Sequence, residues 1–285
     1  MKNRWIIAAG TAVLFIVAFT GIYALMESGD TEDNEKLEHE TPVDVTIPEG
    51  LSLEEMGEIF AEENLMTEEE WMEALDEDEV REHEVTEWVP DNDDEEREHE
   101  MEGLLFPATY TVSPEEEPSD VALTMLDQMQ EEVNESIIDQ AEESDQLEGV
   151  YDALVLASLI ERETMVAEER PQVSGVYHNR LEEDMLLQAD ATVQYLFDEQ
   201  QEQVTYDDLE IESPYNTYQE EGMPPGPISS VSRESIEAAV DPEAHDYLFY
   251  VTKKDGSHEH YFAETYEEHE ENIEQSEENA AEQKE

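Results

Sequence analysis

The sequence predicts an α+β protein that consists of an N-terminal transmembrane helix, a small module with a strand and two helices, and a larger mixed α/β domain. Three observations support this class. Residues 5–26 carry no charge, residues 43–47 alternate between apolar and polar side chains, and residues 153–160 form a nearly unbroken apolar run. The alternation is typical of a half-buried strand, whereas the apolar run is typical of a buried helix.

Acidic residues dominate the composition. Asp and Glu number 81 against 12 Lys and Arg, which gives a formal net charge of -69. This charge would repel nucleic acids and anionic membrane surfaces, so we expect neither as a partner. Salt shortens the Debye length to about 3 Å at 1 M and suppresses repulsion between carboxylates, which favours adaptation to concentrated salt. A disordered acidic chain is the alternative; it fits residues 76–100 and 264–285 but not the patterned segments between them.

The N-terminal apolar segment is expected to be a single-pass anchor in the cell membrane. Residues 5–26 are long enough to cross about 30 Å of hydrocarbon. Lys2 and Arg4 precede the segment and acidic residues follow it. The positive-inside rule therefore places residues 1–4 in the cytoplasm and the remaining chain, beginning with a linker at 27–41, outside. A cleaved signal peptide is the alternative, but the run is long for one and lacks a small-x-small cleavage site.

The small module is expected over residues 42–100. After its strand, Ser52 with Glu55 and Thr67 with Glu70 form two capping boxes, which predict a pair of helices. An acidic loop completes the module. The order βαα(β) resembles that of LysM-like modules, which commonly bind the glycan of peptidoglycan.

The larger domain is expected over residues 101–270, ahead of a disordered acidic tail at 271–285. One helix is predicted to start at Ser119, a second to end at Glu161, and a third to start near Pro171. Polar and aromatic loops, a rigid turn and a hairpin turn follow these helices. They lie at residues 187–192, 213–218, 222–227 and 255–256.

Several kinds of reactive site are excluded by the residues present. The chain has no cysteine, no His-Glu-x-x-His zinc motif, no Gly-x-Ser-x-Gly elbow and no glycine-rich phosphate loop, so we expect neither a metal nor another cofactor. His258 and His260 are more typical of neighbours on a strand than of metal ligands. Carboxylates beside amides and aromatic rings remain, and this mixture is typical of sites that cleave glycosidic bonds.

A set of ordered motifs then indicates a family. The motifs are residues 156–164 (LASLIERET), 176–181 (VYHNRL), 187–193 (LQADATV), 213–218 (SPYNTY), 222–228 (GMPPGPI), and His260-x-Phe262 with His269. With these motifs the chain closely resembles the YceG-like family of membrane-anchored endolytic murein transglycosylases. One departure is Ala191, which stands where the family has a proline between Asp190 and Thr192.

The resemblance implies cleavage of the β-1,4 bond between MurNAc and GlcNAc without water. One carboxyl group would protonate the leaving oxygen and then take the proton of the MurNAc 6-hydroxyl, which closes a 1,6-anhydro ring and ends a nascent strand. Glu161 is predicted to be this catalytic group because it directly follows the apolar run, where burial would raise its pKa, and because it aligns with the family's presumed acid. Glu163 is the rival. Two positions on a helix are about 200° apart, so both cannot face one groove.

Other residues of these motifs are predicted to bind the glycan. An internal salt bridge is an equally good explanation for Arg180, and a hydrogen bond that stabilises a loop is nearly as good for the loop residues. The candidates for substrate binding are Glu163, Asn179, Arg180, Gln188, Asp190, Tyr215, Asn216, Thr217 and Tyr218.

The resemblance also implies partners. They are peptidoglycan glycan strands, penicillin-binding synthases and other proteins of cell-wall elongation or division, and the membrane through the anchor. Two alternatives stay open, namely a non-catalytic murein-binding scaffold and a muramidase that uses water. The products of murein digestion distinguish the three functions. A transglycosylase produces anhydro ends, a scaffold produces no new ends, and a muramidase produces reducing ends.

Overall fold

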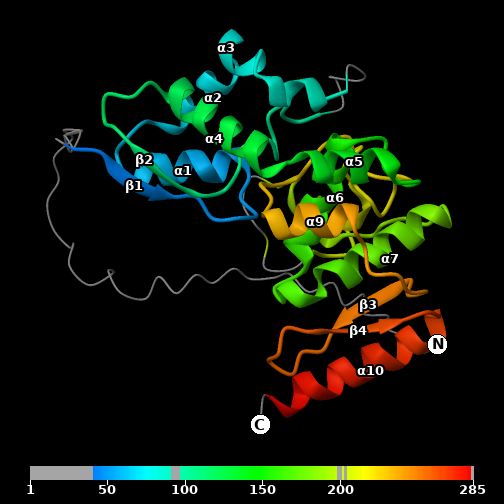
Figure 1. Cartoon of the computed structure of the whole chain (residues 1–285). Coiled ribbons are helices and arrows are strands. Elements are labelled where there is room, and N and C mark those ends of the chain that lie inside the picture. Colours follow the sequence, from blue (N-terminus) through cyan, green and yellow to red (C-terminus); the bar gives the residue numbers. More distant parts are fainter. Residues whose placement is uncertain (1–40, 91–96, 198–200, 202–203, 284–285) are drawn as a thin grey trace, which may run out of the picture.

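The computed structural model describes residues 41–90, 97–197, 201 and 204–283, which form helices and short two-stranded sheets (Figure 1). The described chain is therefore a mixed helix-and-strand protein, as the sequence predicts. The transmembrane helix predicted at residues 5–26 lies outside the described residues. Among the described residues, no helix has both the length and the apolar character that a membrane span needs.

The N-terminal module is completed by a strand that comes later in the chain than expected. After β1 (Val43–Thr46) come α1 (Leu53–Glu62) and α2 (Glu68–Leu75), and β1 pairs antiparallel with β2 (Thr109–Val112). Both predicted capping boxes are present, which confirms the starts of the two helices. Because β2 completes the sheet, the boundary expected at residue 100 falls inside the module.

The acidic stretch after α2 is folded where the sequence suggested a solvated loop. It contains α3 (Asp78–Arg81) and a short 3-10 helix, η1 (Glu84–Trp88), and both pack against α4 (Pro118–Glu132). Val80 and Val85 are fully buried there. These two side chains anchor an otherwise charged segment, so the prediction of an irregular loop is wrong for these turns.

A buried helix forms the centre of the larger domain. α6 (Val150–Glu163) is buried from its first residue to Glu161 except at Asp152, which confirms the helix that the apolar run predicts. α7 carries Pro171 in its first turn, as predicted, and α4 begins one residue before the expected cap, Ser119. The helices packed against α6 are α5 (Glu135–Glu143), α7 (Arg170–Glu182), α8 (Asp190–Gln194) and α9 (Arg233–Val240) (Figure 1).

The C-terminal segment forms a helix and not the disordered tail predicted from residue 271. β3 (Phe249–Thr252) and β4 (His260–Ala263) form an antiparallel hairpin, and α10 (Tyr266–Glu282) packs on it. Three polar side chains of α10 donate hydrogen bonds to backbone carbonyls of the hairpin, at 3.2, 2.7 and 2.6 Å: Asn272 to Phe262, Ser276 to Thr252 and Asn279 to Lys253. Polar contacts hold this helix, so the apolar pattern of the sequence contains little signal for it.

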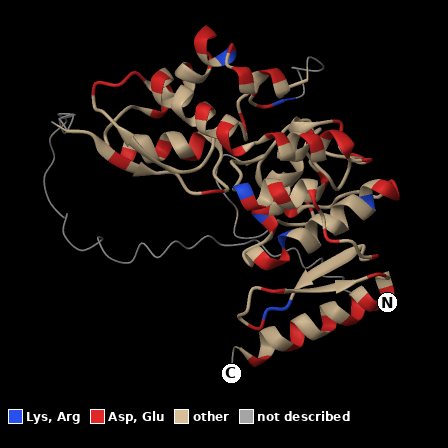
Figure 2. Cartoon of the chain, viewed as in Figure 1, with Lys and Arg blue, Asp and Glu red and all other residues tan. Residues whose placement is uncertain are grey.

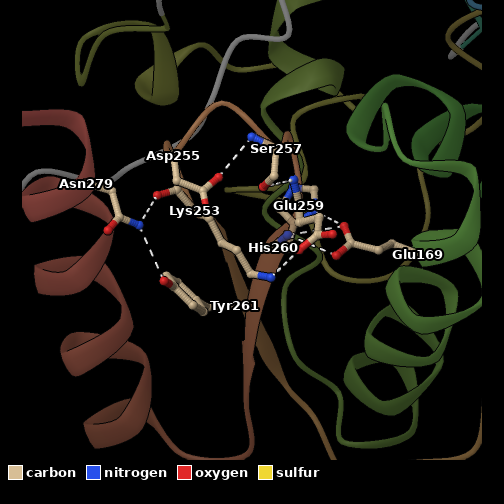
Figure 3. A network of polar contacts seen from close by, with 8 residues as sticks. All are labelled: Glu169, Lys253, Asp255, Ser257, Glu259, His260, Tyr261 and Asn279. Atoms are coloured by element: carbon tan, nitrogen blue, oxygen red, sulfur yellow. Dashed lines mark hydrogen bonds and ion pairs between the residues drawn. The ribbon is translucent and has the colours of Figure 1, made fainter. Parts of the chain in front are cut away.

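Polar contacts also join the hairpin to the segment before α7 (Figure 3). The Glu169 carboxylate accepts a hydrogen bond from the backbone N–H of His260 at 3.0 Å and pairs with Nδ1 of the same residue at 2.7 Å. Lys253 pairs with Glu259 within the hairpin. His258 precedes β4 and has a left-handed backbone (φ 63°), so the two histidines are not neighbours on the strand as predicted.

Backbone hydrogen bonds join the module to the larger domain beside the end of α6. The Gly50 N–H donates to the carbonyl of Ser230 at 3.0 Å, and the Ser230 N–H donates to the carbonyl of Leu51 at 2.8 Å. The Arg162 guanidinium donates to the Gly50 carbonyl at 2.6 Å. These bonds hold the loop between β1 and α1 against the C-terminal end of α6.

Glu102 is a second link between the two parts. Its fully buried side chain accepts hydrogen bonds from the N–H groups of Leu53 and Gly103, both at 3.3 Å, and from the hydroxyl of Tyr195, at the end of α8 in the larger domain, at 3.5 Å. Burial raises the pKa of Glu102 to about 8, and the charge of Glu54 adds to this effect. The carboxyl group is therefore mostly protonated at neutral pH, so the fold buries a neutral group here and not a charge.

Acidic residues are spread along the helices of both parts (Figure 2). We expect the melting temperature to rise by about 10 °C between about 0.1 M and about 1 M KCl, because the Debye length falls from about 10 Å to about 3 Å and repulsion between carboxylates weakens. Calorimetry of the full chain measures the shift, with sucrose at equal osmolality as the control. A melting temperature that does not change with KCl, or that rises by the same amount in sucrose, would contradict adaptation to concentrated salt.

Candidate active site

Glu161 is the acid that the sequence predicts, but its carboxylate is engaged in internal contacts. Its side chain is 4% exposed, and one oxygen pairs with the Arg170 guanidinium at 2.9 Å. The other oxygen accepts hydrogen bonds from the backbone N–H and the hydroxyl of Ser232, the N-cap of α9. Glu161 therefore links α6 to the starts of α7 and α9, and neither oxygen is free to reach a leaving group. The structure does not support its assignment as the acid.

Glu163, the last residue of α6, has a different environment. Its side chain is half-buried, and the hydroxyl of Tyr250 donates a hydrogen bond to Oε2 at 3.1 Å. The pKa of Glu163 is raised to about 7, first by burial and then by the charge of Asp190. Hydrogen bonds from Tyr250 and the Ala191 amide, and the charge of Arg180, lower this pKa and offset part of the rise. A carboxyl group with this pKa is about half protonated at neutral pH, which suits a group that both gives and takes a proton.

Asp190, the first residue of α8, supplies a second carboxylate near Glu163. The hydroxyl of Tyr218 donates a hydrogen bond to it. Burial raises the pKa of Asp190, and the hydrogen bond from Tyr218 lowers it. Of the predicted site residues, the structure thus brings together Glu163, Asp190 and Tyr218.

Asn179 and Arg180 of α7 form internal contacts. The Asn179 amide donates to two carbonyls of the segment that leads into β3, at 2.8 and 2.9 Å. The buried Arg180 guanidinium donates to the carbonyls of Leu248 and Leu187 at 2.7 and 2.6 Å. Both residues therefore position the backbone around the site. The hydrogen bonds of Arg180 go to backbone carbonyls, whereas the sequence suggested a salt bridge to a carboxylate.

Most of the loop residues predicted to bind glycan are buried. The Asn216 amide donates to two carbonyls of its own loop at 3.1 and 2.7 Å. The Thr217 hydroxyl accepts a hydrogen bond from the Ala189 N–H at 3.0 Å, and Tyr215 is 1% exposed. Gln188 is exposed and has a left-handed backbone (φ 50°). The first three residues stabilise their loops, whereas Gln188 is accessible to a substrate.

Sequence reasoning missed the role of Tyr177 and Tyr250. The hydroxyl of Tyr250 lies 2.9 Å from that of Tyr177, which is fully buried in α7. The sequence pattern places Tyr247, Phe249 and Val251 on one face of a strand, which leaves Tyr250 on the other. No local signal indicates that this second face covers the end of α6, because the contact depends on how the hairpin packs.

A cavity of about 560 Å³ lies between the module and the larger domain. Its walls include Ser52 from the module and Arg162, Ala191 and Phe197 from the domain. Glu163 itself does not line this cavity, but Arg162, its neighbour in the chain, does, and so does Ala191, whose backbone amide bonds to the Glu163 side chain. Within the described residues, no cluster of three or more His, Asp or Glu side chains is arranged to hold a metal ion.

Comparison with known proteins adds to this geometry. A model of the YceG-like family matches residues 14–275 of the chain. The chain belongs to the YceG-like family. A crystal structure of a YceG-like protein from Listeria monocytogenes is similar to it with a TM-score of 0.72 and 32% identity, over 81% of this chain and 76% of that one.

Two curated relatives of this YceG-like chain are both named endolytic murein transglycosylase. The relative from Bacillus subtilis (strain 168) is 35% identical over 231 residues, which covers 79% of the chain and 62% of the relative. The relative from Streptococcus pneumoniae (strain R6) is 29% identical over 278 residues, which covers 89% of the chain and 50% of the relative. The chain thus spans between 50% and 62% of the length of these relatives.

Proposed function

We propose that this YceG-like chain is a membrane-anchored endolytic transglycosylase that cleaves the β-1,4 bond between MurNAc and GlcNAc in peptidoglycan and leaves a 1,6-anhydro end. The name of its relatives supports this class of reaction. The observation that carries the proposal is Glu163, a half-buried carboxyl group with a pKa raised to about 7 by burial and by the charge of Asp190. The environment that the sequence analysis expected at Glu161 thus occurs two residues later.

In the proposed mechanism, Glu163 acts first as an acid and then as a base. Its proton passes to the glycosidic oxygen as the bond from that oxygen to C1 of MurNAc breaks, and GlcNAc leaves with a new 4-hydroxyl group. The Glu163 carboxylate then takes the proton of the MurNAc 6-hydroxyl, whose oxygen attacks C1 and closes the anhydro ring. Glu163 regains in the second step the proton that it lost in the first, so the reaction consumes no water.

Asp190 assists this cycle by its negative charge. An anion near C1 stabilises the positive charge that develops on the sugar ring in the transition state. The same charge raises the pKa of Glu163 and so keeps its acid form populated. The hydrogen bond from Tyr218 holds the Asp190 carboxylate in place.

The glycan strand is proposed to run through the cavity between the module and the domain. A volume of about 560 Å³ has room for saccharide units, and Phe197 offers a ring on which a sugar can stack. The LysM-like module then forms one wall of the substrate groove. Gln188 offers an exposed amide near Asp190 for hydrogen bonds to the sugar.

The proposed place of action is the outer face of the cell membrane. The uncharged segment at residues 5–26, preceded by two cations, supports an anchor with a cytoplasmic N-terminus. The active site would then meet glycan strands while synthases extend them, and cleavage would end strand growth. Penicillin-binding synthases are accordingly the proposed protein partners.

Mass spectrometry of purified glycan strands incubated with the full chain tests this function. We expect new 1,6-anhydro-MurNAc ends. New reducing MurNAc ends would identify a muramidase instead. Strands that bind to the protein without new ends would identify a murein-binding scaffold.

Asp190→Asn is expected to shift the pH profile of cleavage to lower pH. The alkaline limb of kcat/KM follows loss of the proton from the free acid, and removal of the Asp190 charge lowers the pKa of Glu163, so this limb should move down by about one pH unit. Asparagine keeps the acceptor for Tyr218. Asp139→Asn, on the exposed side of α5, is the matched control. Equal shifts in both variants, or an upward shift in Asp190→Asn, would refute the role of Asp190.

A further inference from the structure

Two tyrosine hydroxyl groups form a chain of hydrogen bonds that ends on Glu163. The hydroxyl of the buried Tyr177 lies 2.9 Å from that of Tyr250, and the Tyr250 hydroxyl lies 3.1 Å from Oε2 of Glu163. The two rings meet edge to face with centroids 6.3 Å apart, and the Tyr250 ring also meets His260 edge to face at 5.4 Å. Packing on two sides thus fixes the phenol that contacts Glu163.

The number of hydrogens sets the direction of this chain. Each phenol has one hydrogen to donate, and an ionised carboxylate only accepts. When Glu163 is ionised, Tyr250 donates to Glu163, and Tyr177 must therefore donate to Tyr250. Two phenols in series thus hold Oε2 of the Glu163 carboxylate.

We propose that Tyr250, supported by Tyr177, is a positioning residue that fixes the Glu163 carboxyl group for both proton transfers. This inference rests on the proposed transglycosylase function. A glutamate side chain rotates about three bonds, and a carboxyl group misplaced by about 1 Å can cost about 10²-fold in rate. A donor held in place on one oxygen prevents this rotation during both proton transfers.

Other charged groups near Glu163 stay in place when only the hydroxyl of Tyr250 is removed. Asp190 favours the protonated form of Glu163 and Arg180 favours the ionised form. Within α6, Glu161 is paired with Arg170, and the Arg162 guanidinium donates to the Gly50 carbonyl. The groups that face Glu163 or Tyr250 from the surrounding elements are Asp190 of α8, Arg180 and Tyr177 of α7, and His260 of β4 with its partner Glu169.

Tyr250→Phe in the full chain tests the proposal because it removes the hydroxyl and keeps the ring. We expect the alkaline limb of kcat/KM for anhydro-end formation to move up by about one pH unit, since the ionised form of Glu163 loses a donor. We also expect kcat to fall about tenfold with KM unchanged, because Tyr250 orients Glu163 and does not touch the glycan. The proposal would be overturned if the alkaline limb of the pH profile did not shift, or if the variant changed KM and left kcat unchanged.

Three further variants separate positioning from a loss of folding. Tyr177→Phe should shift the limb upward by less than Tyr250→Phe, and the double variant should match Tyr250→Phe, because Tyr177 reaches Glu163 through Tyr250. Additive shifts would overturn this series arrangement. The double variant also avoids the buried, unpaired hydroxyl that Tyr250→Phe leaves on Tyr177. Tyr266→Phe, at an exposed position of α10, is the control and should keep the wild-type profile.

The inference and the proposed function can fail separately. A wild-type chain that releases no anhydro ends would overturn both. A wild-type chain that releases them, together with a Tyr250→Phe variant that has the wild-type pH profile and kcat, would overturn the positioning role alone.

Discussion

Glu163→Gln is expected to lower the release of 1,6-anhydro ends by about 10²- to 10⁴-fold, the contribution typical of a positioned acid and base. Glutamine keeps the shape of the side chain and can accept the hydrogen bond from Tyr250, but it has no proton that a glycosidic oxygen can take. The neutral amide also avoids the penalty of burying a charge, so the free energy of unfolding should not fall. Mass spectrometry of the products and urea denaturation measure the two effects.

A matched control for this variant is Glu168→Gln, at an exposed position between α6 and α7. It should change neither cleavage nor stability. Cleavage by Glu163→Gln at the wild-type rate would remove Glu163 from the mechanism.

Glu161→Gln is expected to have the opposite effects. It leaves the Arg170 guanidinium, which is 15% exposed, without its carboxylate, and it weakens the acceptor for both donors of Ser232. Removal of one partner of a buried ion pair strands the other charge, so the free energy of unfolding should fall by on the order of 3 kcal/mol. Urea denaturation at constant salt measures this loss, while cleavage per folded molecule should stay within a few-fold of wild type.

Stability is the quantity that decides the role of Glu161. A Glu161→Gln variant that unfolds like the wild type but no longer cleaves glycan would restore Glu161 as the acid. Arg170→Gln offers an independent check, because it breaks the same ion pair from the other side and should destabilise the chain without changing the pH profile of cleavage.

The elements that the sequence predicted well are those with local signals. The two capping boxes, the apolar run of α6 and Pro171 at the start of α7 each act within one helix, and the structure has all of these helices. The turns around Val80 have no comparable signal, and α10 has only a capping box, Thr265 with Glu268, that the sequence analysis did not use. α10 is held by polar bonds to the hairpin, and single apolar anchors hold the acidic turns, so both depend on contacts that are distant in the sequence.

The proposed site lies at the end of the helix that the sequence predicted, but its carboxyl group, Glu163, lies on a different side of that helix from Glu161. Helical geometry places Glu161 and Glu163 on different sides, and it does not say which side faces the substrate. The partners that decide this lie 71 residues away for Ser232 and Glu161, and 87 residues away for Tyr250 and Glu163. Asp190 and Tyr218 come from loop motifs, and their bond across 28 residues likewise becomes visible only in the folded chain.

The assignment of Glu163 as acid and base is tested most directly by a comparison of the two glutamine variants at equal concentrations of folded protein. Mass spectrometry of glycan strands digested in parallel should find 1,6-anhydro ends with Glu161→Gln and almost none with Glu163→Gln. Anhydro ends formed by Glu163→Gln but not by Glu161→Gln would contradict the assignment.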